Sequence, residues 1–377
     1  MKKIIKDKVL PEKAITFDDV LLLPGYSDFT RDDIDLSIKL HANINLRIPI
    51  ISSPMDTVTE AEMAIYLAQN GALGIIHRNL SAQEQAEMIE TVKKERVKNS
   101  SRAALDSKGR LLVGVAVGAG SDLNKTVKIL EKAGADIIVL DSANGFSKYI
   151  IDALKKIKSL TKLPVMAGNI ATYDGAKAMI ESGADILRVG MGPGSICTTR
   201  IVTGMGVPQV TAVMETVRAA SEKGIPVIAD GGIKQIGDIA KALGFGASAV
   251  MLGSMLAGFD ESPGEVIMAN GIKFKQYRGM GSIPAMKKGS AERYGQNFDA
   301  KKLVAEGVEA IIKYKGHVED FIYQIEGGLR SSFYDIGGKT IDEFYEKSRF
   351  IEISGNGLTE SHPHDISITD SGGSYFV

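Results

Sequence analysis

The chain has 377 residues, 44% of them apolar and 24% charged, with a formal net charge of −1. Such a composition is typical of a soluble globular protein, and no apolar run reaches the length of a membrane span. The near-zero charge and the lack of tryptophan argue against a nucleic-acid partner, and a single cysteine excludes an internal disulfide and fits the cytoplasm.

Short apolar segments recur along the chain and predict the strands of one buried parallel sheet. They span 48–52, 72–77, 111–118, 135–142, 163–169, 184–190, 225–232 and 247–254. Runs this short and this continuously apolar are expected where both faces of a strand are covered. Amphipathic segments of helix length separate most of them, so the pattern favours a single α/β domain over 1–377, a (β/α)8 TIM barrel. A doubly wound open sheet is the alternative.

Two of the predicted helices carry start signals. Thr59 with Glu62, and Ser81 with Glu84, have the spacing of capping boxes, and Gly71 follows the first of these helices. These signals predict helices over 59–71 and 81–97. Chemistry in such barrels lies on the loops after the strands, and these loops open with polar and glycine-rich residues here.

Glycines follow the seventh and eighth predicted strands, where such barrels often bind phosphate. Gly232 and Gly253 leave backbone N–H groups accessible, and Ser195 and Ser254 add hydroxyl donors. The alternative is that the glycines only turn the chain. Asp141, at the end of the fourth strand, is suited to a ribose diol, and a helix N-cap or a loop turn formed by Asp141 or Ser142 fits the sequence equally well.

Two regions depart from the repeat. Residues 260–316, called the flap segment below, are glycine-rich with little helical periodicity, and the tail 354–377 is expected to be flexible unless something binds it. The flap segment carries Lys273, Lys275, Arg278, Lys287, Lys288 and Arg293 against Glu292. This charge fits a mobile flap over an anionic ligand, and equally an exposed surface loop.

The only cysteine, Cys197, lies in the stretch GPGSICTTR at 192–200. By itself a lone cysteine is more often an inert buried residue than a nucleophile. No HExxH or CxxC motif is present, so a catalytic transition metal is not expected.

Together, long ordered motifs make the chain resemble the IMP dehydrogenase/GMP reductase family, and within it the dehydrogenases. They include ITFDDVLLLPGYS, ISSPMDTVTE, GALGIIHRN, VLDSANG, AGNIAT, GPGSICTTRIVTGMGVPQ, IADGGI, YRGMGSIPAM, ERYGQ, EGGLRS and ESHPHDI. The resemblance implies a barrel that oxidises IMP to XMP with NAD on the way to guanine nucleotides. It also implies a homotetramer that binds a monovalent cation, usually K+.

The resemblance further implies roles for individual residues. Cys197 is expected to attack C2 of the purine, and Thr199, Arg293 and Tyr294 to support hydrolysis of the resulting thioimidate. The residues implied for the substrate are Ser53, Met55, Asn169, Ser195, Asp230, Gly231, Gly232, Gly253, Ser254, Tyr277, Gly279, Met280, Gly281 and Glu306. Those implied for NAD are Asp141, Ser142, Ala143, Arg188, Gly190, Met191 and Gly192. The cation is expected at carbonyls of Gly192, Gly194 and Cys197, completed by Glu360, Ser361 and His362 of a neighbouring subunit.

One departure from the family pattern concerns regulation. Most members carry a pair of CBS modules after the second helix, whereas this chain continues from KKERV through a short link, at about 97–104, to the third strand. Nucleotide regulation through that module is therefore not expected. A GMP reductase that uses NADPH and a non-catalytic nucleotide-binding barrel are the alternatives, and the Arg293–Tyr294 pair favours the dehydrogenase.

Overall fold

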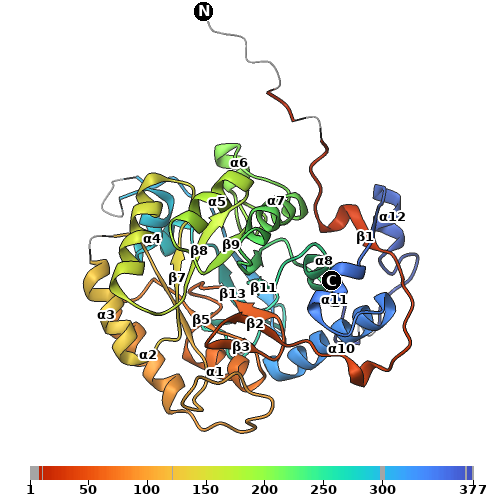
Figure 1. The fold of residues 1–377 in the computed structure, drawn as a ribbon, viewed down its shortest axis with the longest axis horizontal. Helices are drawn as coiled ribbons and strands as arrows, with labels where there is room; N and C mark the ends of the chain where they lie inside the picture. The colour runs from red at the N-terminus through yellow and green to blue at the C-terminus, as the bar shows by residue number, and fades with distance from the viewer. Residues whose placement is uncertain (1–7, 11, 121, 298–301, 370–371, 376–377) are drawn as a thin grey trace, which may run out of the picture.

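The computed structural model describes residues 8–10, 12–120, 122–297, 302–369 and 372–375, and it shows a (β/α)8 barrel (Figure 1). The barrel strands are β4 (Ile50–Ser52), β5 (Ile75–Ile76), β6 (Gly114–Val117), β7 (Ile137–Asp141), β8 (Val165–Ile170), β9 (Ile186–Val189), β10 (Val227–Asp230) and β11 (Ala249–Leu252). β5 to β11 pair in chain order and β11 pairs with β4, all in parallel. Leu73 closes the ring, since its N–H donates to Ile50 at 3.1 Å and its carbonyl accepts from Ser52 at 2.9 Å. The barrel prediction is confirmed, and the open sheet was wrong.

Helices surround this barrel, and apolar side chains fill its interior. The outer helices include α1 (Ala61–Gln69), α2 (Ala82–Lys94), α3 (Leu123–Ala133), α4 (Lys148–Leu160), α5 (Tyr173–Glu181), α7 (Gln209–Ser221), α8 (Ile236–Gly244) and α10 (Val318–Ile336). The interior cluster includes Ile51, Ile75, Val139, Met166 and Met251, all fully buried. A hairpin of β2 (Ile38–His41) and β3 (Ile44–Leu46) adds Leu40, Ile44 and Leu46 to this cluster. The hairpin thereby covers the end of the barrel where β4 begins, which leaves the opposite rim for a site.

The two predicted helix starts have different outcomes. The capping box of α2 is confirmed, because Ser81 Oγ accepts from the Glu84 N–H at 3.2 Å and Glu84 Oε2 accepts from the Ser81 N–H at 2.7 Å. The box at Thr59 was wrong, because the residue at the N-cap of α1 is Glu60. Thr59 is fully buried, and its hydroxyl donates to the Ser53 carbonyl at 2.8 Å, so it stabilises the loop after β4 instead.

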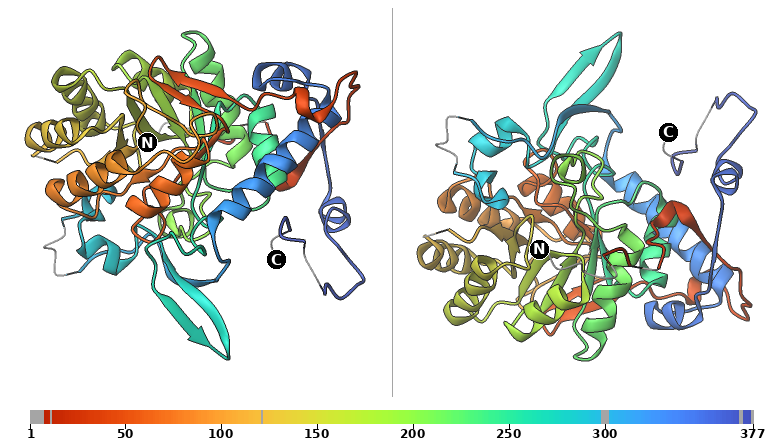
Figure 2. Two further views of the ribbon diagram at one scale, coloured as in Figure 1. Left: turned by 90° about the horizontal axis from the view of Figure 1, so that it is seen from below. Right: turned by 90° about the horizontal axis from the view of Figure 1, so that it is seen from above.

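The flap segment has more regular structure than its sequence suggested. It contains an antiparallel sheet of β12 (Val266–Ala269), β13 (Ile272–Arg278) and β14 (Glu309–Lys313), the helix α9 (Ile283–Lys287) and the 3-10 helix η3 (Ser290–Tyr294). The β12–β13 hairpin, coloured teal, projects from the barrel (Figure 2). Its turn is Asn270-Gly271, with φ of +50° and +77°, a pair that favours two-residue hairpins. Residues 298–301 lie outside the described residues, and the mobility of the segment stays a prediction.

Two of the basic residues in the flap segment have structural partners. Lys275 is buried and its Nζ donates to the Phe259 carbonyl at 2.9 Å, and burial lowers the pKa of Lys275. Arg278 forms an ion pair with Asp56, with 2.6 Å between Nη2 and Oδ2. Arg278 therefore anchors the flap segment to the loop after β4, and Lys275 ties β13 to the start of the same segment. Neither cation forms part of a basic face open to a ligand.

The tail and the short link also have defined structure. The helix α12 (Gly355–Glu360) occupies the start of the tail, and the flexibility of the tail stays a prediction. The tail residues 370–371 and 376–377 lie outside the described residues. In the link between α2 and β6, Asp106 accepts from Lys93 Nζ at 3.1 Å, and Lys93 also pairs with Asp136 of the barrel at 2.6 Å. Among the described residues no helix is long and apolar enough to cross a membrane.

Candidate active site

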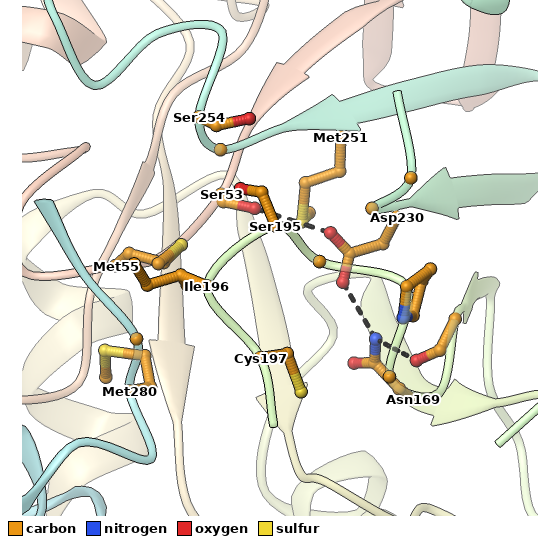
Figure 3. Close-up of a pocket in the computed structure, with 18 of the residues that line it drawn as sticks. Ser53, Met55, Asn169, Ser195, Ile196, Cys197, Asp230, Met251, Ser254 and Met280 are labelled. Carbon is orange, nitrogen blue, oxygen red and sulfur yellow. Dashed lines mark hydrogen bonds between the residues drawn. The ribbon is translucent and has the colours of Figure 1, made fainter. Parts of the chain in front are cut away.

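A cavity of about 210 Å³ opens at the carboxyl end of the barrel strands (Figure 3). Every residue predicted to bind the substrate lines it, except Gly281. The predicted catalytic residues Cys197, Arg293 and Tyr294 line it as well. Because the strand ends of a parallel barrel meet at one rim, residues far apart in the sequence converge here, as expected.

Gly281 lies directly behind residues that line the cavity. A Cβ atom added at Gly281 would come within 2.8 Å of the Tyr294 ring and 2.9 Å of the Glu306 carbonyl carbon. The position therefore has no space for a side chain. Gly281 serves the site by allowing these two segments to pack closely.

Cys197 is half-buried, and its sulfur begins a chain of polar contacts. Thr199 Oγ1 lies 3.2 Å from Cys197 Sγ and donates to Glu306 Oε2 at 2.8 Å. The backbone also joins the two segments, since the Thr198 N–H donates to the Glu306 carbonyl at 3.0 Å. The thiol therefore does not lie in the apolar core, and a carboxylate is connected to it through one hydroxyl.

The end of the cavity expected to bind phosphate has a backbone that only glycine adopts easily. Gly231 and Gly232 have φ of +87° and +78°. A Cβ atom at Gly253 would lie 3.3 Å from the Tyr277 hydroxyl. Burial raises the pKa of Tyr277 to about 12, while a hydrogen bond with Ser195 acts to lower it. Tyr277 is thus a neutral phenol near neutral pH and a donor for an anion.

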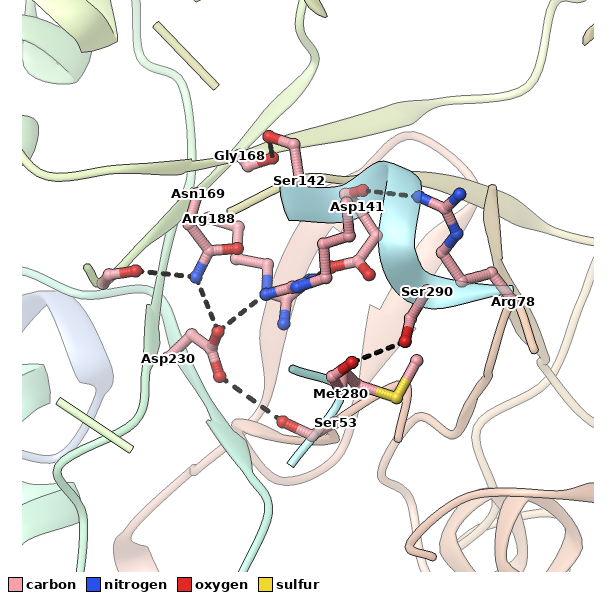
Figure 4. A network of polar contacts seen from close by, with 12 residues as sticks. Ser53, Arg78, Asp141, Ser142, Gly168, Asn169, Arg188, Asp230, Met280 and Ser290 are labelled. Atoms are coloured by element: carbon pink, nitrogen blue, oxygen red, sulfur yellow. Dashed lines mark hydrogen bonds and ion pairs between the residues drawn. The ribbon is translucent and has the colours of Figure 1, made fainter. Parts of the chain in front are cut away.

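A buried network of charges lies beneath the cavity (Figure 4). Asp230 accepts from Arg188 Nε at 2.9 Å and from Asn169 Nδ2 at 2.8 Å, and Ser53 Oγ lies 3.4 Å from its other oxygen. Arg188 is 3% exposed, and its Nη1 also donates to Asp141 at 2.6 Å. Arg188 therefore orients both Asp230, which is predicted to bind the substrate, and Asp141, which is predicted to bind NAD.

A second cavity, of about 300 Å³, adjoins the first. Ser142, Ala143 and Met191, all predicted for NAD, line it together with Thr199. Both cavities share Arg293, Tyr294 and Glu306 in their linings. The predicted Gly190 and Gly192 line the first cavity instead, and Asp141 is almost fully buried, with 1% of its surface exposed.

Neither Asp141 nor Ser142 caps a helix. The N-cap of α4 is Ser147, and the Ser142 hydroxyl donates to the Gly168 carbonyl at 2.7 Å. The N-cap alternative for this strand end was therefore wrong. Asp141 instead belongs to the buried charge network.

The 3-10 helix η3 lies against the loop after β7. The Arg293 guanidinium forms an ion pair with the Asp141 carboxylate, and the Ala143 N–H donates to the Arg293 carbonyl at 3.1 Å. Burial raises the pKa of Tyr294, so its phenol also stays protonated near neutral pH. In this structure the flap segment is docked on residues that the sequence predicted for NAD.

Sequence reasoning missed Arg78 and Tyr149, two residues that contact Glu292 of η3. Arg78, in the loop after β5, forms an ion pair with Glu292 at 2.7 Å, and Tyr149 of α4 donates to Glu292 at 3.0 Å. Arg78 is the first basic residue after the predicted strand at 72–77. Because functional residues of such barrels lie in the loops after the strands, its position could have marked it as a candidate site residue.

The predicted cation ligands of this chain lie in two separate places. The Gly194 carbonyl, on the loop of Cys197, accepts from the Cys197 N–H at 3.1 Å. Ser361 donates to Gly357 at 2.8 Å and His362 contacts the Tyr375 hydroxyl at 3.0 Å, so both contact their own tail. Across the described residues no group of three or more His, Cys, Asp or Glu side chains is arranged to hold a metal ion.

Comparison with known proteins adds an independent finding. A family profile described as "IMP dehydrogenase / GMP reductase domain" matches residues 14–364. The chain is 46% identical over 386 residues to an inosine-5'-monophosphate dehydrogenase of Cryptosporidium parvum, covering 94% of this chain and 96% of that protein. It is 40% identical to the protein of the same name from Aquifex aeolicus and 39% to that from Halalkalibacterium halodurans, in both cases over 97% of this chain and 98% of the relative.

Proposed function

The chain belongs to the IMP dehydrogenase / GMP reductase family, and on this premise we propose that it is an IMP dehydrogenase that converts IMP to XMP with NAD in guanine nucleotide biosynthesis. One observation carries the proposal beyond family membership. The thiol of Cys197 lines the cavity at the carboxyl end of the barrel strands and is linked through Thr199 to the carboxylate of Glu306. The rim therefore offers a nucleophile, a proton acceptor and an anion-binding end in one place.

The substrate is proposed to lie with its phosphate toward Tyr277 and the glycines Gly232 and Gly253. The Asp230 carboxylate is held in place by Arg188 and suits the ribose diol, since its oxygens accept hydrogen bonds. The hypoxanthine base then extends toward Cys197. This orientation brings C2 of the purine to the sulfur.

The first half of the reaction forms and then oxidises a covalent adduct. The Cys197 thiol loses its proton, along the Thr199–Glu306 connection or directly to solvent, and the sulfur adds to C2. NAD, which Ser142, Ala143 and Met191 would hold, would supply a nicotinamide ring able to accept a hydride from C2. The products of this half are NADH and a thioimidate between Cys197 and the purine.

The second half is hydrolysis, in which water adds to C2 and the sulfur leaves as the thiol. The family pattern assigns this step to Arg293 and Tyr294. A guanidinium donates hydrogen bonds and offers no acceptor, and the guanidinium of Arg293 forms an ion pair with the Asp141 carboxylate. We therefore assign Arg293 the role of a fixed cation next to the water, with Thr199 and Glu306 available to accept the proton.

The dinucleotide, during the first half of the reaction, and the docked flap segment, during the second, are proposed to occupy the second cavity in turn. Arg293 is docked against Asp141 and Ala143, which are predicted to contact NAD, and the two cavities share the residue. The dinucleotide and the docked flap segment therefore compete for this space. The flap segment docks after NADH leaves and excludes bulk water from the adduct.

The remaining parts of the proposal concern assembly and regulation. Backbone carbonyls of the Cys197 loop are oxygen donors of the kind that K+ accepts, and the shell is completed by Glu360, Ser361 and His362 of a neighbouring subunit in a homotetramer. The ordered α2–β6 link supports the interpretation that the CBS pair is missing. A single cysteine fits the reducing cytoplasm.

The direct test supplies purified protein with IMP, NAD and KCl and follows the absorbance of NADH. NADH formation supports the dehydrogenase. Consumption of NADPH with release of ammonia from GMP would establish the reductase instead, and nucleotide binding without either reaction would establish an inert barrel. Arg293→Ala is expected to retain a burst of NADH while slowing the steady-state release of XMP, and an equal loss of both phases would remove its hydrolytic role.

A further inference from the structure

Arg78 connects the barrel to the flap segment through two contacts on different partners. Its Nη2 donates to Glu292 Oε2 at 2.7 Å. Its Nη1 donates to the Asp141 backbone carbonyl at 3.2 Å, a contact drawn in Figure 4. Only 8% of the Arg78 side chain is exposed, against 36% of Glu292. This pair is therefore more shielded from solvent than an ordinary surface ion pair, which contributes little.

The loop after β6 leaves room for this pair. A Cβ atom at Gly118 would lie 2.1 Å from Arg78 Nη2, and one at Gly120 would lie 3.3 Å from Glu292 Oε2. A side chain at Gly118 thus conflicts with the observed position of the guanidinium. The backbone of this loop is shaped around the ion pair.

Tyr149 holds the other oxygen of the same carboxylate. Tyr149 belongs to α4, and its hydroxyl donates to Glu292 Oε1 at 3.0 Å, whereas Arg78 donates to Oε2. Burial and the Glu292 charge raise the pKa of Tyr149, so the phenol remains a donor near neutral pH. Glu292 is therefore bound at both oxygens by two separate elements of the barrel.

Glu292 immediately precedes Arg293 in η3, so fixing one residue fixes the other. Tyr149 and Glu292 also line the second cavity, proposed above for the dinucleotide. We propose that Arg78 and Tyr149 are positioning residues that grip Glu292 and thereby hold Arg293 in the docked state during hydrolysis. These three residues, Arg78, Tyr149 and Glu292, form the flap latch. The inference rests on the proposed function and adds the device that sets the balance between docked flap and bound dinucleotide.

The test uses Glu292→Gln, which keeps the shape of the side chain and removes its charge. Rapid mixing of the full-length variant with IMP and NAD separates the NADH burst from steady-state turnover. The latch predicts an unchanged burst amplitude and a steady-state rate lower by roughly tenfold. A factor of this size corresponds to the free energy that a hydrogen bond to a charged group contributes. It also predicts a lower KM for NAD, because a weaker docked state competes less with the dinucleotide. Glu265→Gln, an exposed carboxylate just before β12 in the same segment, is the matched control and should leave both phases unchanged.

Two further variants test whether Arg78 acts through Glu292. Arg78→Lys should also slow the steady state, and adding it to Glu292→Gln should cause little further loss, because the two residues share one interaction. Tyr149→Phe should show the same pattern more weakly.

An unchanged steady state and KM in Glu292→Gln overturns the latch, as does full additivity with Arg78→Lys. A reduced burst with an unchanged KM also overturns it, since that pattern indicates damage to the first half of the reaction. If the unmodified protein forms no NADH from IMP, the proposed function fails first and the latch fails with it.

Discussion

Replacing Thr199 by valine is expected to slow hydrolysis selectively. Valine has the shape of threonine without the hydroxyl that lies 3.2 Å from Cys197 Sγ and donates to Glu306 at 2.8 Å. The variant therefore removes the connection between the thiol and the carboxylate with little change in packing. Glu306 is left without a donor at one oxygen.

The size of the effect follows from the kind of bond that is lost. A hydrogen bond to a charged group contributes about 1.5–3 kcal/mol. At about 1.4 kcal/mol for each factor of ten, the hydrolytic step should slow by roughly 10- to 100-fold. The first half loses less, because a thiol near a docked substrate can also release its proton to solvent.

The assay is rapid mixing with IMP and NAD, followed by steady-state measurement. The expected result is a burst of NADH close to that of the unmodified protein, followed by slow turnover and accumulation of the covalent adduct. Thr91→Val, on the exposed face of α2, is a matched control that should change neither phase. Equal slowing of burst and steady state, or no slowing at all, would refute the role assigned to Thr199.

Three other variants test separate parts of the account. Tyr277→Phe removes a buried donor at the phosphate end and should raise the KM for IMP roughly tenfold with little change in kcat; a lower kcat at unchanged KM would contradict this placement in steady-state assays. Burial acts to raise the pKa of Asp56, but hydrogen bonds, led by the one from Arg278, outweigh burial and lower the pKa. The ion pair therefore stabilises the fold above the unfolded pKa of about 3.9, and this stabilisation is lost as the pH falls through the lower folded pKa. Asp56→Asn should therefore destabilise the fold by about 3 kcal/mol at pH 7, and thermal unfolding that shows the same deficit below pH 4 would contradict the reasoning. Gly118→Ala should displace Arg78 and slow steady-state turnover with the NADH burst retained, and unchanged kinetics would show that the guanidinium moves without consequence.

The barrel was predictable from sequence because its strands are buried on both faces and therefore leave continuous apolar runs. The capping box of Ser81 was also predictable, since it depends on residues three apart in an exposed turn. The same spacing at Thr59 failed because the tertiary fold buries that hydroxyl against the loop after β4. The β12–β13 hairpin was missed although Asn270-Gly271 is a strong turn signal, because a glycine-rich region was interpreted as irregular throughout.

The sequence predicted which residues lie in the site, but it did not predict how they contact one another. The family resemblance named most of the residues that line the cavity, and many of these follow barrel strands whose ends reach the same rim. That Arg188 and Arg293 both contact Asp141 depends on three segments meeting in space, which no local pattern encodes. Charge counting likewise treated Lys275 and Arg278 as open cations, although Lys275 donates to the Phe259 carbonyl and Arg278 pairs with Asp56 of the loop after β4.

The central claim is that Cys197 forms a covalent bond with the purine during turnover. The most direct measurement is the mass of the protein after brief incubation with IMP and NAD and an acid quench, followed by peptide mapping. The account predicts one added nucleotide on the peptide that contains Cys197, formed together with NADH and absent when NAD is omitted. NADH formation without an adduct, or substantial turnover by Cys197→Ala, would contradict it.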